Sequence, residues 1–275
     1  MEKFHSEFGH NYKTYSFGYA NYCIRERKDK LSDIYAAGYL PYSGSPGVKD
    51  IFYMARSARV PLGSFKFSSE NRRVAGKFDP VVEIQDASPK GSANINLNHT
   101  TGRGDKLIRE SILFKNFDMR DKGFINFCSD YFSKRHGPLV MPEERLKTIL
   151  NYGLITDIVS YSMNNKQLAY VFEVSDKDMT HFWYSFYDIS LVYQSLGMWL
   201  MLDSVRHAQK AGKKNFYVGT VYGEKALYKT AFDNVEYWDG GEWIDDKKQL
   251  KKLGCSDNEK AVNITDDWKS KIELF

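Results

Sequence analysis

The stretch from Tyr187 to Phe232 decides the fold, and it reads YDISLVYQSLGMWLMLDSVRHAQKAGKKNFYVGTVYGEKALYKTAF. Its pattern predicts the end of a strand, a Ser-Leu-Gly turn, a helix over 196–211, a short strand over 216–219 and a last helix over 224–232. The backbone N–H groups that open a helix lack intrahelical partners, and such a cluster favours a phosphate or another anion. This stretch therefore predicts an anion site where its first helix begins.

The residues just upstream predict an antiparallel sheet. Strand-like runs cover 155–163, 168–174 and 181–188, and the Asn-Asn-Lys sequence at 164–166 predicts a hairpin turn between the first two. Antiparallel strands that lead into a strand, helix, strand, helix unit predict an α/β (α+β) fold, a mixed and mostly antiparallel sheet flanked by helices. That order is similar to the core of the GCN5-related N-acetyltransferase (GNAT) fold, which implies a GNAT-like acyltransferase.

The other segments give simpler expectations. We expect a helix over 29–37, a Gly/Pro/Ser turn cluster over 41–47, and strands within 51–62 and 68–78. Proline and glycine residues over 79–104 predict a loop, hairpin or linker. A long helix is expected over 106–136, broken near Gly123, and a further helix is expected to open at Pro142.

The composition is that of an ordinary soluble protein, with 42% hydrophobic and 27% charged residues in a chain of 275. No window approaches the roughly 20 apolar residues of a membrane span, and the first residues lack the apolar core of a signal peptide. Cys23, Cys128 and Cys255 are far apart and form no CxxC pair, which predicts buried, reduced thiols. We therefore expect a cytoplasmic protein without a metal site or a membrane partner.

Positive charge is concentrated in one segment. The whole chain carries 39 basic and 35 acidic residues, and this small excess says little about partners. Between 56 and 77, however, a single acid accompanies six basic residues, namely Arg56, Arg59, Lys66, Arg72, Arg73 and Lys77. A local excess of this kind can bind a polyanion or a carboxylate, and the alternative is a solvated basic face.

Several blocks, in order, resemble the arginyl-tRNA protein transferase family and its bacterial relatives that transfer leucine. The sequence GYLPYSG at 38–44 resembles the family's G-F-R-R-S-G turn, and 59–74 resembles its R-V-x-V-x-x-F-x-P-S-R-S-Q-R-R-V run. Tyr-Asp at 187–188 and Ser-Leu-Gly at 195–197 are similar to Y-D-P…S-L-G, and 217–232 is similar to Y-L-G-Y…Y-K-x-x-F. The resemblance covers most of 15–243. It implies an N-terminal family region over 1–104 and a GNAT-like domain over 105–275.

The chain also departs from the family pattern. The family's paired cysteines fall near Phe52 and Ala55, and neither residue is cysteine here. Leu40 and Pro41 stand where the family turn has two arginines, and the stretch between Gly219 and Tyr228 is about two residues shorter. These departures bear on the choice of substrate more than on the class of reaction.

The resemblance implies that an amino acid, arginine or leucine, passes from an aminoacyl-tRNA to the N-terminal α-amine of a protein, without a cofactor. Asp188 is a candidate acceptor of the incoming ammonium and its proton, with a turn or cap aspartate as the alternative. Tyr228 is a candidate proton donor to the leaving ribose hydroxyl, and Tyr222 competes for that role. Lys229 is expected to stabilise the developing oxyanion or a phosphate.

The binding residues follow from the same resemblance. Backbone N–H groups of Ser195, Leu196 and Gly197, together with Gly219, are expected to hold the phosphate-bearing donor, although a plain helix cap is the alternative. The arginine side chains expected to read an acidic N-terminus or the tRNA backbone are Arg59, Arg72 and Arg73.

Two other functions stay open at this point. The first is a coenzyme A dependent N-acetyltransferase, with acetyl-CoA as donor, because residues 194–199 partly fit the Q/R-x-x-G-x-G/A pyrophosphate motif. Trp199 stands at the second small position of that motif, which counts against it. The second is a non-catalytic RNA-binding or adaptor protein on the same fold.

Overall fold

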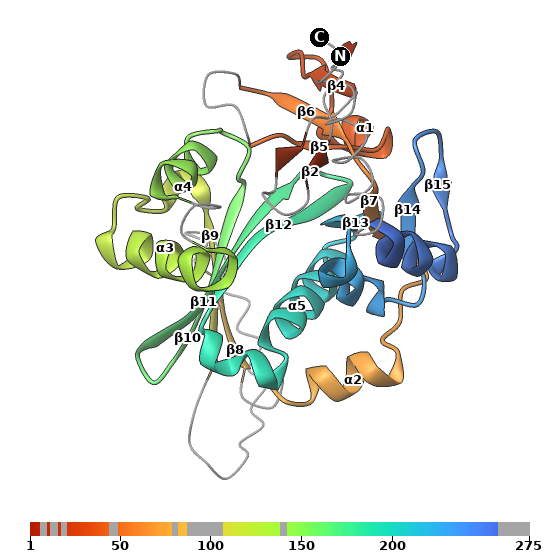
Figure 1. Ribbon diagram of the computed structural model, residues 1–275. Coiled ribbons are helices and arrows are strands. Elements are labelled where there is room, and N and C mark those ends of the chain that lie inside the picture. Colours follow the sequence, from red (N-terminus) through yellow and green to blue (C-terminus); the bar gives the residue numbers. More distant parts are fainter. Residues whose placement is uncertain are drawn as a thin grey trace, which may run out of the picture. The chain divides into compact units, whose positions relative to one another are not determined.

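The computed structural model describes residues 1–5, 10–11, 16–17, 21–43, 49–78, 82–86, 107–137 and 142–257 (Figure 1). The chain divides into two compact units. Unit 1 combines Met1–Pro61 with Tyr217–Phe275, and unit 2 is Leu62–Phe216. The division into 1–104 and 105–275 rests on family resemblance and stays a prediction.

The sheet of unit 2 confirms the predicted antiparallel strands. Its strands are β8 (Val82–Asp86), β9 (Leu107–Leu113), β10 (Asp157–Met163), β11 (Lys166–Ser175) and β12 (Met179–Tyr187). They lie in the order β12-β11-β10-β9-β8, and all neighbours are antiparallel except the parallel pair β8 and β9. Asn164 and Asn165, with φ of 52° and 62°, make the tight turn of the β10–β11 hairpin.

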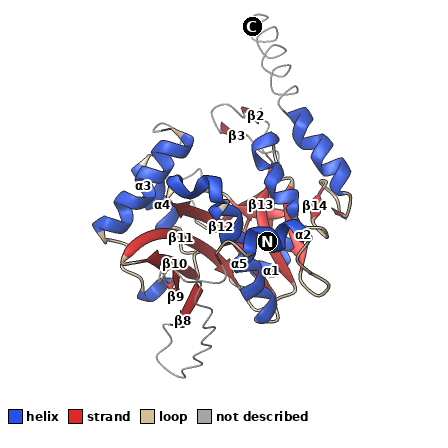
Figure 2. Cartoon of the chain, turned by 90° about the horizontal axis from the view of Figure 1, so that it is seen from below, coloured by secondary structure: helices blue, strands red, loops and turns tan. Residues whose placement is uncertain are grey.

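Helices cover both faces of this sheet (Figures 1 and 2). On one face, α3 (Lys122–His136) and α4 (Glu143–Leu150) bury an aromatic core with strand residues such as Ile158 and Phe186. On the other face, α5 (Leu196–Lys210) packs its Trp199 ring 5.4 Å from the Tyr161 ring, and α2 (Ser69–Ala75) lies beside α5. The expected class, a mixed and mostly antiparallel sheet flanked by helices, is confirmed.

The predicted long helix over 106–136 is wrong in its first half. Residues Leu107–Leu113 form β9, which pairs with β10 throughout its length. Leu107 and Arg109 are buried on alternate positions, as a strand requires. The helix begins only at Lys122, because the Asp121 carboxylate caps it by accepting the Phe124 N–H at 2.6 Å.

The expected strand over 68–78 is also wrong, because Ser69–Ala75 forms the short helix α2. Ser68 provides the N-cap, and its hydroxyl oxygen accepts the Asn71 N–H at 3.1 Å. Arg72 and Arg73 therefore lie in the last turn of a helix and not on a strand edge.

Unit 1 contains a four-stranded antiparallel sheet in the order β1-β4-β6-β5. Its strands are β1 (Glu2–His5), β4 (Asn21–Ile24), β6 (Ile51–Met54) and β5 (Tyr39–Pro41); a separate pair joins β2 (His10–Asn11) and β3 (Ser16–Phe17). The expected helix near 29–37 is α1 (Leu31–Ala36). Cys23 is buried and pairs with Phe52 across β4 and β6.

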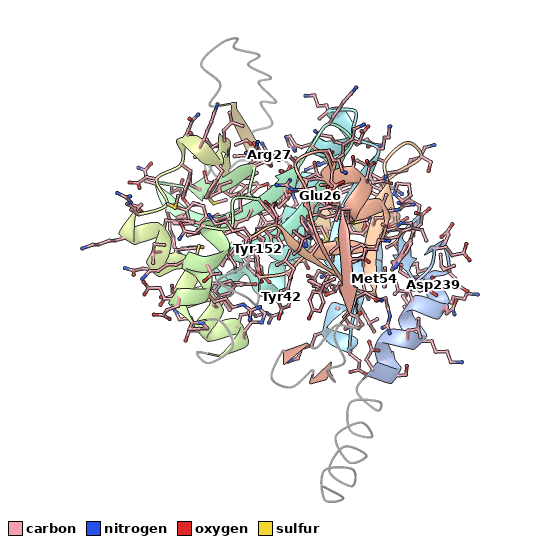
Figure 3. The ribbon with its side chains drawn as sticks, turned by 90° about the horizontal axis from the view of Figure 1, so that it is seen from above. Glu26, Arg27, Tyr42, Met54, Tyr152 and Asp239 are labelled. Carbon is pink, nitrogen blue, oxygen red and sulfur yellow. The ribbon has the colours of Figure 1, made fainter. Side chains whose placement is uncertain are left out.

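The second part of unit 1 joins distant sequence segments. β7 (Ser57–Pro61) pairs with β14 (Glu236–Trp238), which pairs with β15 (Trp243–Ile244). Asp239, labelled in Figure 3, accepts the N–H groups of Gly241 and Glu242 and closes the turn between β14 and β15. The 3₁₀ helix η4 (Glu224–Ala231) and a helix over 247–257 complete this part, and β13 (Asn215–Thr220) crosses the boundary between the units.

Several expectations on single residues have clear outcomes. Cys128, like Cys23, is buried, whereas Cys255 is exposed, so its predicted burial is wrong. Residues 44–47 of the turn cluster predicted over 41–47, and most of the loop predicted over 79–104, lie outside the described residues. Within the described ranges, no helix is long and apolar enough to cross a membrane.

Candidate functional site

Asp188 lies in unit 2 directly after β12, as predicted, and both of its carboxylate oxygens have partners. Oδ2 accepts the Lys166 ammonium at 2.6 Å, and Oδ1 accepts the N–H and hydroxyl of Ser190 at 3.0 and 2.6 Å. The Lys166 hydrogen bond and then those from Ser190 hold the pKa of Asp188 below its usual value. Asp188 therefore caps the 3₁₀ helix η3 (Ile189–Gln194) and is a poor proton acceptor.

The start of α5 lies one 3₁₀ helix further along the chain. Ser195 adopts the left-handed conformation, with φ of 66°, and its side chain makes no capping hydrogen bond. A Cβ atom on Gly197 would come within 2.9 Å of the Tyr187 ring and hydroxyl. Gly197 therefore permits the close approach of Tyr187 from β12, while Leu196 is buried in the core.

Arg72 and Arg73 lie in unit 2 on the solvent-exposed side of α2. Arg72 donates to the Phe67 carbonyl at 2.6 Å and to the Ser69 hydroxyl at 3.3 Å, so part of its guanidinium is used within the helix. Arg73 forms a two-point ion pair with Glu70, at 2.7 and 2.5 Å. That pair is exposed, and solvent screening lets an external anion compete for Arg73.

Lys229 and Tyr228 lie side by side in unit 1 on η4. The Lys229 ammonium is partly buried, donates to the Thr220 carbonyl at 2.8 Å and lies 6.0 Å from the centre of the Tyr228 ring. Across the described ranges no carboxylate pairs with it, and burial lowers the pKa of Lys229 to about 8. Tyr228 is 50% exposed, an unusual exposure for so large an aromatic side chain.

The loop between β13 and η4 brings the remaining unit 1 candidates together. Gly219 and Gly223 have φ of 85° and 68°, values that suit glycine. Thr220, which follows Gly219, carries the carbonyl that binds Lys229. The Tyr222 hydroxyl accepts the Arg56 N–H at 2.7 Å and is thus tied to the backbone of β6–β7. Tyr228 is therefore the better placed of the two candidate tyrosines.

Arg59 is used within unit 1. Its Nε donates to the Glu236 carboxylate at 2.7 Å across the β7–β14 pair. Its guanidinium also lies 4.1 Å from the centre of the Trp243 ring, a cation–π contact. An acidic peptide would have to share Arg59 with Glu236, which makes Arg59 a weaker candidate for reading a carboxylate than the sequence indicates.

Sequence reasoning missed a buried charge network beneath α5 in unit 2. Asp203 is 2% exposed and accepts from Arg109 Nε at 2.9 Å, the Tyr161 hydroxyl at 2.8 Å and Arg206 at 3.1 Å. Burial favours a higher pKa for Asp203, but the neighbouring positive charges, Arg109 first, hold it below its usual value. Every residue of this network is ionisable, and that was the signal the sequence offered. Arg109, Tyr161 and Asp203 are far apart in the sequence, however, so no spacing indicates that they meet.

Glu173 is a second buried acid near this network. It lies on β11, and within the described part of the molecule its Oε1 has no hydrogen-bond partner. Burial raises the pKa of Glu173 to about 7, against the opposing effect of Arg109. The cost of burying this carboxylate makes the position sensitive to pH.

The candidates thus form two groups, one in each unit. Asp188 and the segment 195–197 flank η3 in unit 2, and Gly219, Tyr228 and Lys229 surround one loop of unit 1. Trp199 stands where the coenzyme A motif has a small residue. It is fully buried between Phe78 and Tyr161. Within the described ranges, no three His, Cys, Asp or Glu residues gather as metal ligands do.

Comparison with known proteins adds an independent finding, although no family model matches the chain. The chain is similar to proteins named aspartate/glutamate leucyltransferase. The protein from Dinoroseobacter shibae is 45% identical over 62 residues, or 22% of each chain. That from Ruegeria sp. is 29% identical over 122 residues, or 42% of this chain and 44% of the relative. This chain therefore matches between about a fifth and somewhat under half of the length of these relatives.

A solved structure, the C-terminal domain of a lysylphosphatidylglycerol synthetase from Agrobacterium fabrum, aligns with 70% of this chain and 50% of that chain. Its TM-score is 0.39 at 13% identity. The named relatives, and not this alignment, bear on the class of enzyme. Over part of its length, this chain is thus similar to enzymes named as leucyltransferases.

Proposed function

We propose that this protein transfers an amino acid, leucine or arginine, from an aminoacyl-tRNA to the N-terminal α-amine of a protein. The similarity to enzymes named aspartate/glutamate leucyltransferase carries the proposal. The geometry of unit 1 agrees with it, because Lys229 provides a partly buried cation beside an exposed tyrosine. Leucine is favoured over arginine because the relatives' name specifies it.

The reaction requires little acid–base assistance. The neutral α-amine attacks the ester carbonyl carbon, a C–N bond forms, and the C–O bond to the ribose breaks. The nitrogen loses a proton and the departing ribose oxygen gains one. Roughly a tenth of an α-amine with a pKa near 8 is neutral at pH 7, so deprotonation costs only about 1.4 kcal/mol. Holding the amine against the carbonyl contributes more than a strong base would.

We assign the roles according to the contacts of each side chain. Lys229, protonated near neutral pH, stabilises the oxyanion that develops on the ester carbonyl. Tyr228 supplies the proton to the ribose oxygen. Asp188 is not assigned the proton transfer, because the hydrogen bond from Lys166 holds its pKa low and both of its oxygens have partners. The N–H groups of 195–197 bind a phosphate of the donor.

The direct test incubates the purified protein with a pool of labelled aminoacyl-tRNAs and with peptides that differ only in their first residue. Transfer of one amino acid to peptides beginning with Asp or Glu is the expected result. Labelling by acetyl-CoA, or thermal stabilisation by it, would instead identify the N-acetyltransferase. Binding of tRNA without any transfer would identify the adaptor.

The assigned roles are tested by Lys229→Met and Tyr228→Phe. Each variant is expected to lower kcat, Lys229→Met by about 100-fold, with the KM for aminoacyl-tRNA little changed, because both groups act on charge that develops in the transition state. Lys225→Met is the matched control, since Lys225 is an exposed lysine on the same η4. Normal single-turnover rates in either variant would remove that residue from the mechanism.

A further inference from the structure

In the helix described over 247–257, the carboxylate of Asp257 binds the loop beside Lys229. Asp257 is 3% exposed, and its Oδ2 accepts hydrogen bonds from Arg56 Nη1 at 2.8 Å and from the Gly223 N–H at 2.8 Å. Its Oδ1 accepts one from Arg56 Nη2 at 3.1 Å. The two-point geometry fixes the direction of the Arg56 guanidinium as well as its position.

Arg56 binds the opposite side of the same loop. The Val221 N–H donates to the Arg56 carbonyl at 3.0 Å, and Arg56 Nη1 donates to the Val221 carbonyl at 3.2 Å. The Arg56 N–H donates to the Tyr222 hydroxyl at 2.7 Å, and its guanidinium lies 4.8 Å from the centre of the Tyr222 ring. Residues 221, 222 and 223 therefore each contact Arg56 or Asp257.

The same helix also packs against η4. A Cβ atom on Gly254 would lie 2.6 Å from Cδ2 of Leu227, so glycine allows the helix to approach the residue next to Tyr228. Lys229 donates to the carbonyl of Thr220, at the other end of the loop. Both attachments of η4, through Leu227 and through Thr220, thus depend on where the helix and the loop are held.

We propose that Asp257 is a positioning residue for Tyr228 and Lys229, acting through Arg56 and the loop 220–223. The inference rests on the proposed function for the reaction that is positioned. Displacing a reacting group by about 1 Å can cost about 100-fold in rate. Asp257 contributes by holding the carbonyl that binds the Lys229 ammonium, and it touches neither the donor nor the acceptor.

The test uses Asp257→Asn, which keeps the size of the side chain and removes its charge, in the full-length protein. We expect kcat for aminoacyl transfer to fall at least tenfold, with both KM values within about twofold of the wild type. Asp233→Asn is the matched control, because it breaks an ion pair of the same helix, between Lys247 and Asp233 at 3.3 Å, away from the loop. The control is expected to keep the wild-type rate.

A double-mutant cycle separates positioning from general loss of stability. Asp257→Asn should lower kcat much less in a Tyr228→Phe background than in the wild type. In that background the reacting hydroxyl, which Asp257 helps to position, is already missing. Full additivity of the two effects would contradict the inference. Arg56→Lys, which keeps the charge but loses the two-point contact, should reproduce the kcat loss if Asp257→Asn proves too unstable to assay.

A readout without catalysis distinguishes this inference from the proposed function. Amide hydrogen exchange of a peptide spanning 219–228 should quicken at least fivefold in Asp257→Asn and remain unchanged in Asp233→Asn. If the wild type transfers no amino acid but exchange responds in this way, the proposed function fails and the loop attachment stands. If the wild type is active and Asp257→Asn changes neither exchange nor kcat, the positioning role is wrong.

Discussion

Lys229 shows how one side chain acquires chemical character from its surroundings. An ordinary lysine amine has a pKa near 10.4, and burial lowers that of Lys229 to about 8, even though its ammonium donates to the Thr220 carbonyl. The folded protein thus holds a cation that is present at pH 7 and is largely lost by pH 9. Transfer by the Lys229-dependent route should decline over this range, unlike the unaided attack of a free amine.

Removing one partner of the buried Arg109–Asp203 pair should strongly destabilise the folded protein. Asp203→Ala leaves the Arg109 guanidinium buried, at 3% exposure, without its carboxylate. Loss of one partner from a buried pair costs about 3–5 kcal/mol, and denaturant unfolding monitored by circular dichroism would measure it. Glu70→Ala, which breaks the exposed Glu70–Arg73 pair, is the control and should change little.

Glu173 should make stability depend on pH in the opposite sense to most carboxylates. Its pKa is raised in the folded protein to about 7, so folding becomes less favourable as the pH rises from about 4.5 to 7. Glu173→Gln removes this loss and should stabilise the protein at pH 8 by on the order of 3 kcal/mol. The gain should nearly vanish at pH 4. Equal gains at both pH values would show that the ionisation of Glu173 is not responsible.

At the scale of single elements, the sequence predicts correctly the helices and strands whose ends are marked by a turn-forming or capping residue. The Asn164–Asn165 turn, Pro142 and Gly212 mark ends that the structure confirms. The errors occurred where tertiary partners decide. The segment 107–113 becomes a strand through pairing with β10 and burial of Arg109 against Asp203, which lies 94 residues away. The site shows the same limit, because no spacing reveals that Lys166 neutralises Asp188.

At the start of α5, only a residue without a side chain fits at Gly197, because the Tyr187 ring of β12 lies against it. In Gly197→Ala the new methyl group would lie 2.9 Å from the Tyr187 ring, so the helix or the ring must shift. Overpacking of this kind costs about 1–3 kcal/mol, to be measured by thermal unfolding. Adding Tyr187→Ala should remove part of that specific penalty, and a double-mutant cycle without coupling would contradict the contact as its cause.

At the scale of the whole molecule, a charged donor should make binding sensitive to salt. If aminoacyl-tRNA binds, the logarithm of its affinity falls linearly with the logarithm of the salt concentration. Arg73→Gln should lessen this slope by about 1 if Arg73 contacts a phosphate. Lys134→Gln, which alters a comparable exposed helical ion pair, is the control. An unchanged slope for Arg73→Gln would exclude that contact.

The segments that make up unit 1 leave the ribosome at very different times. Arg56 and Asp257 are separated by 201 positions, whereas Leu62–Phe216 is one uninterrupted run. During synthesis, that middle run can therefore collapse on its own before β14, the partner of β7, has been made. A nascent chain cut short before Glu236 would leave β7 without β14, and an unpaired strand edge of this kind is prone to aggregation.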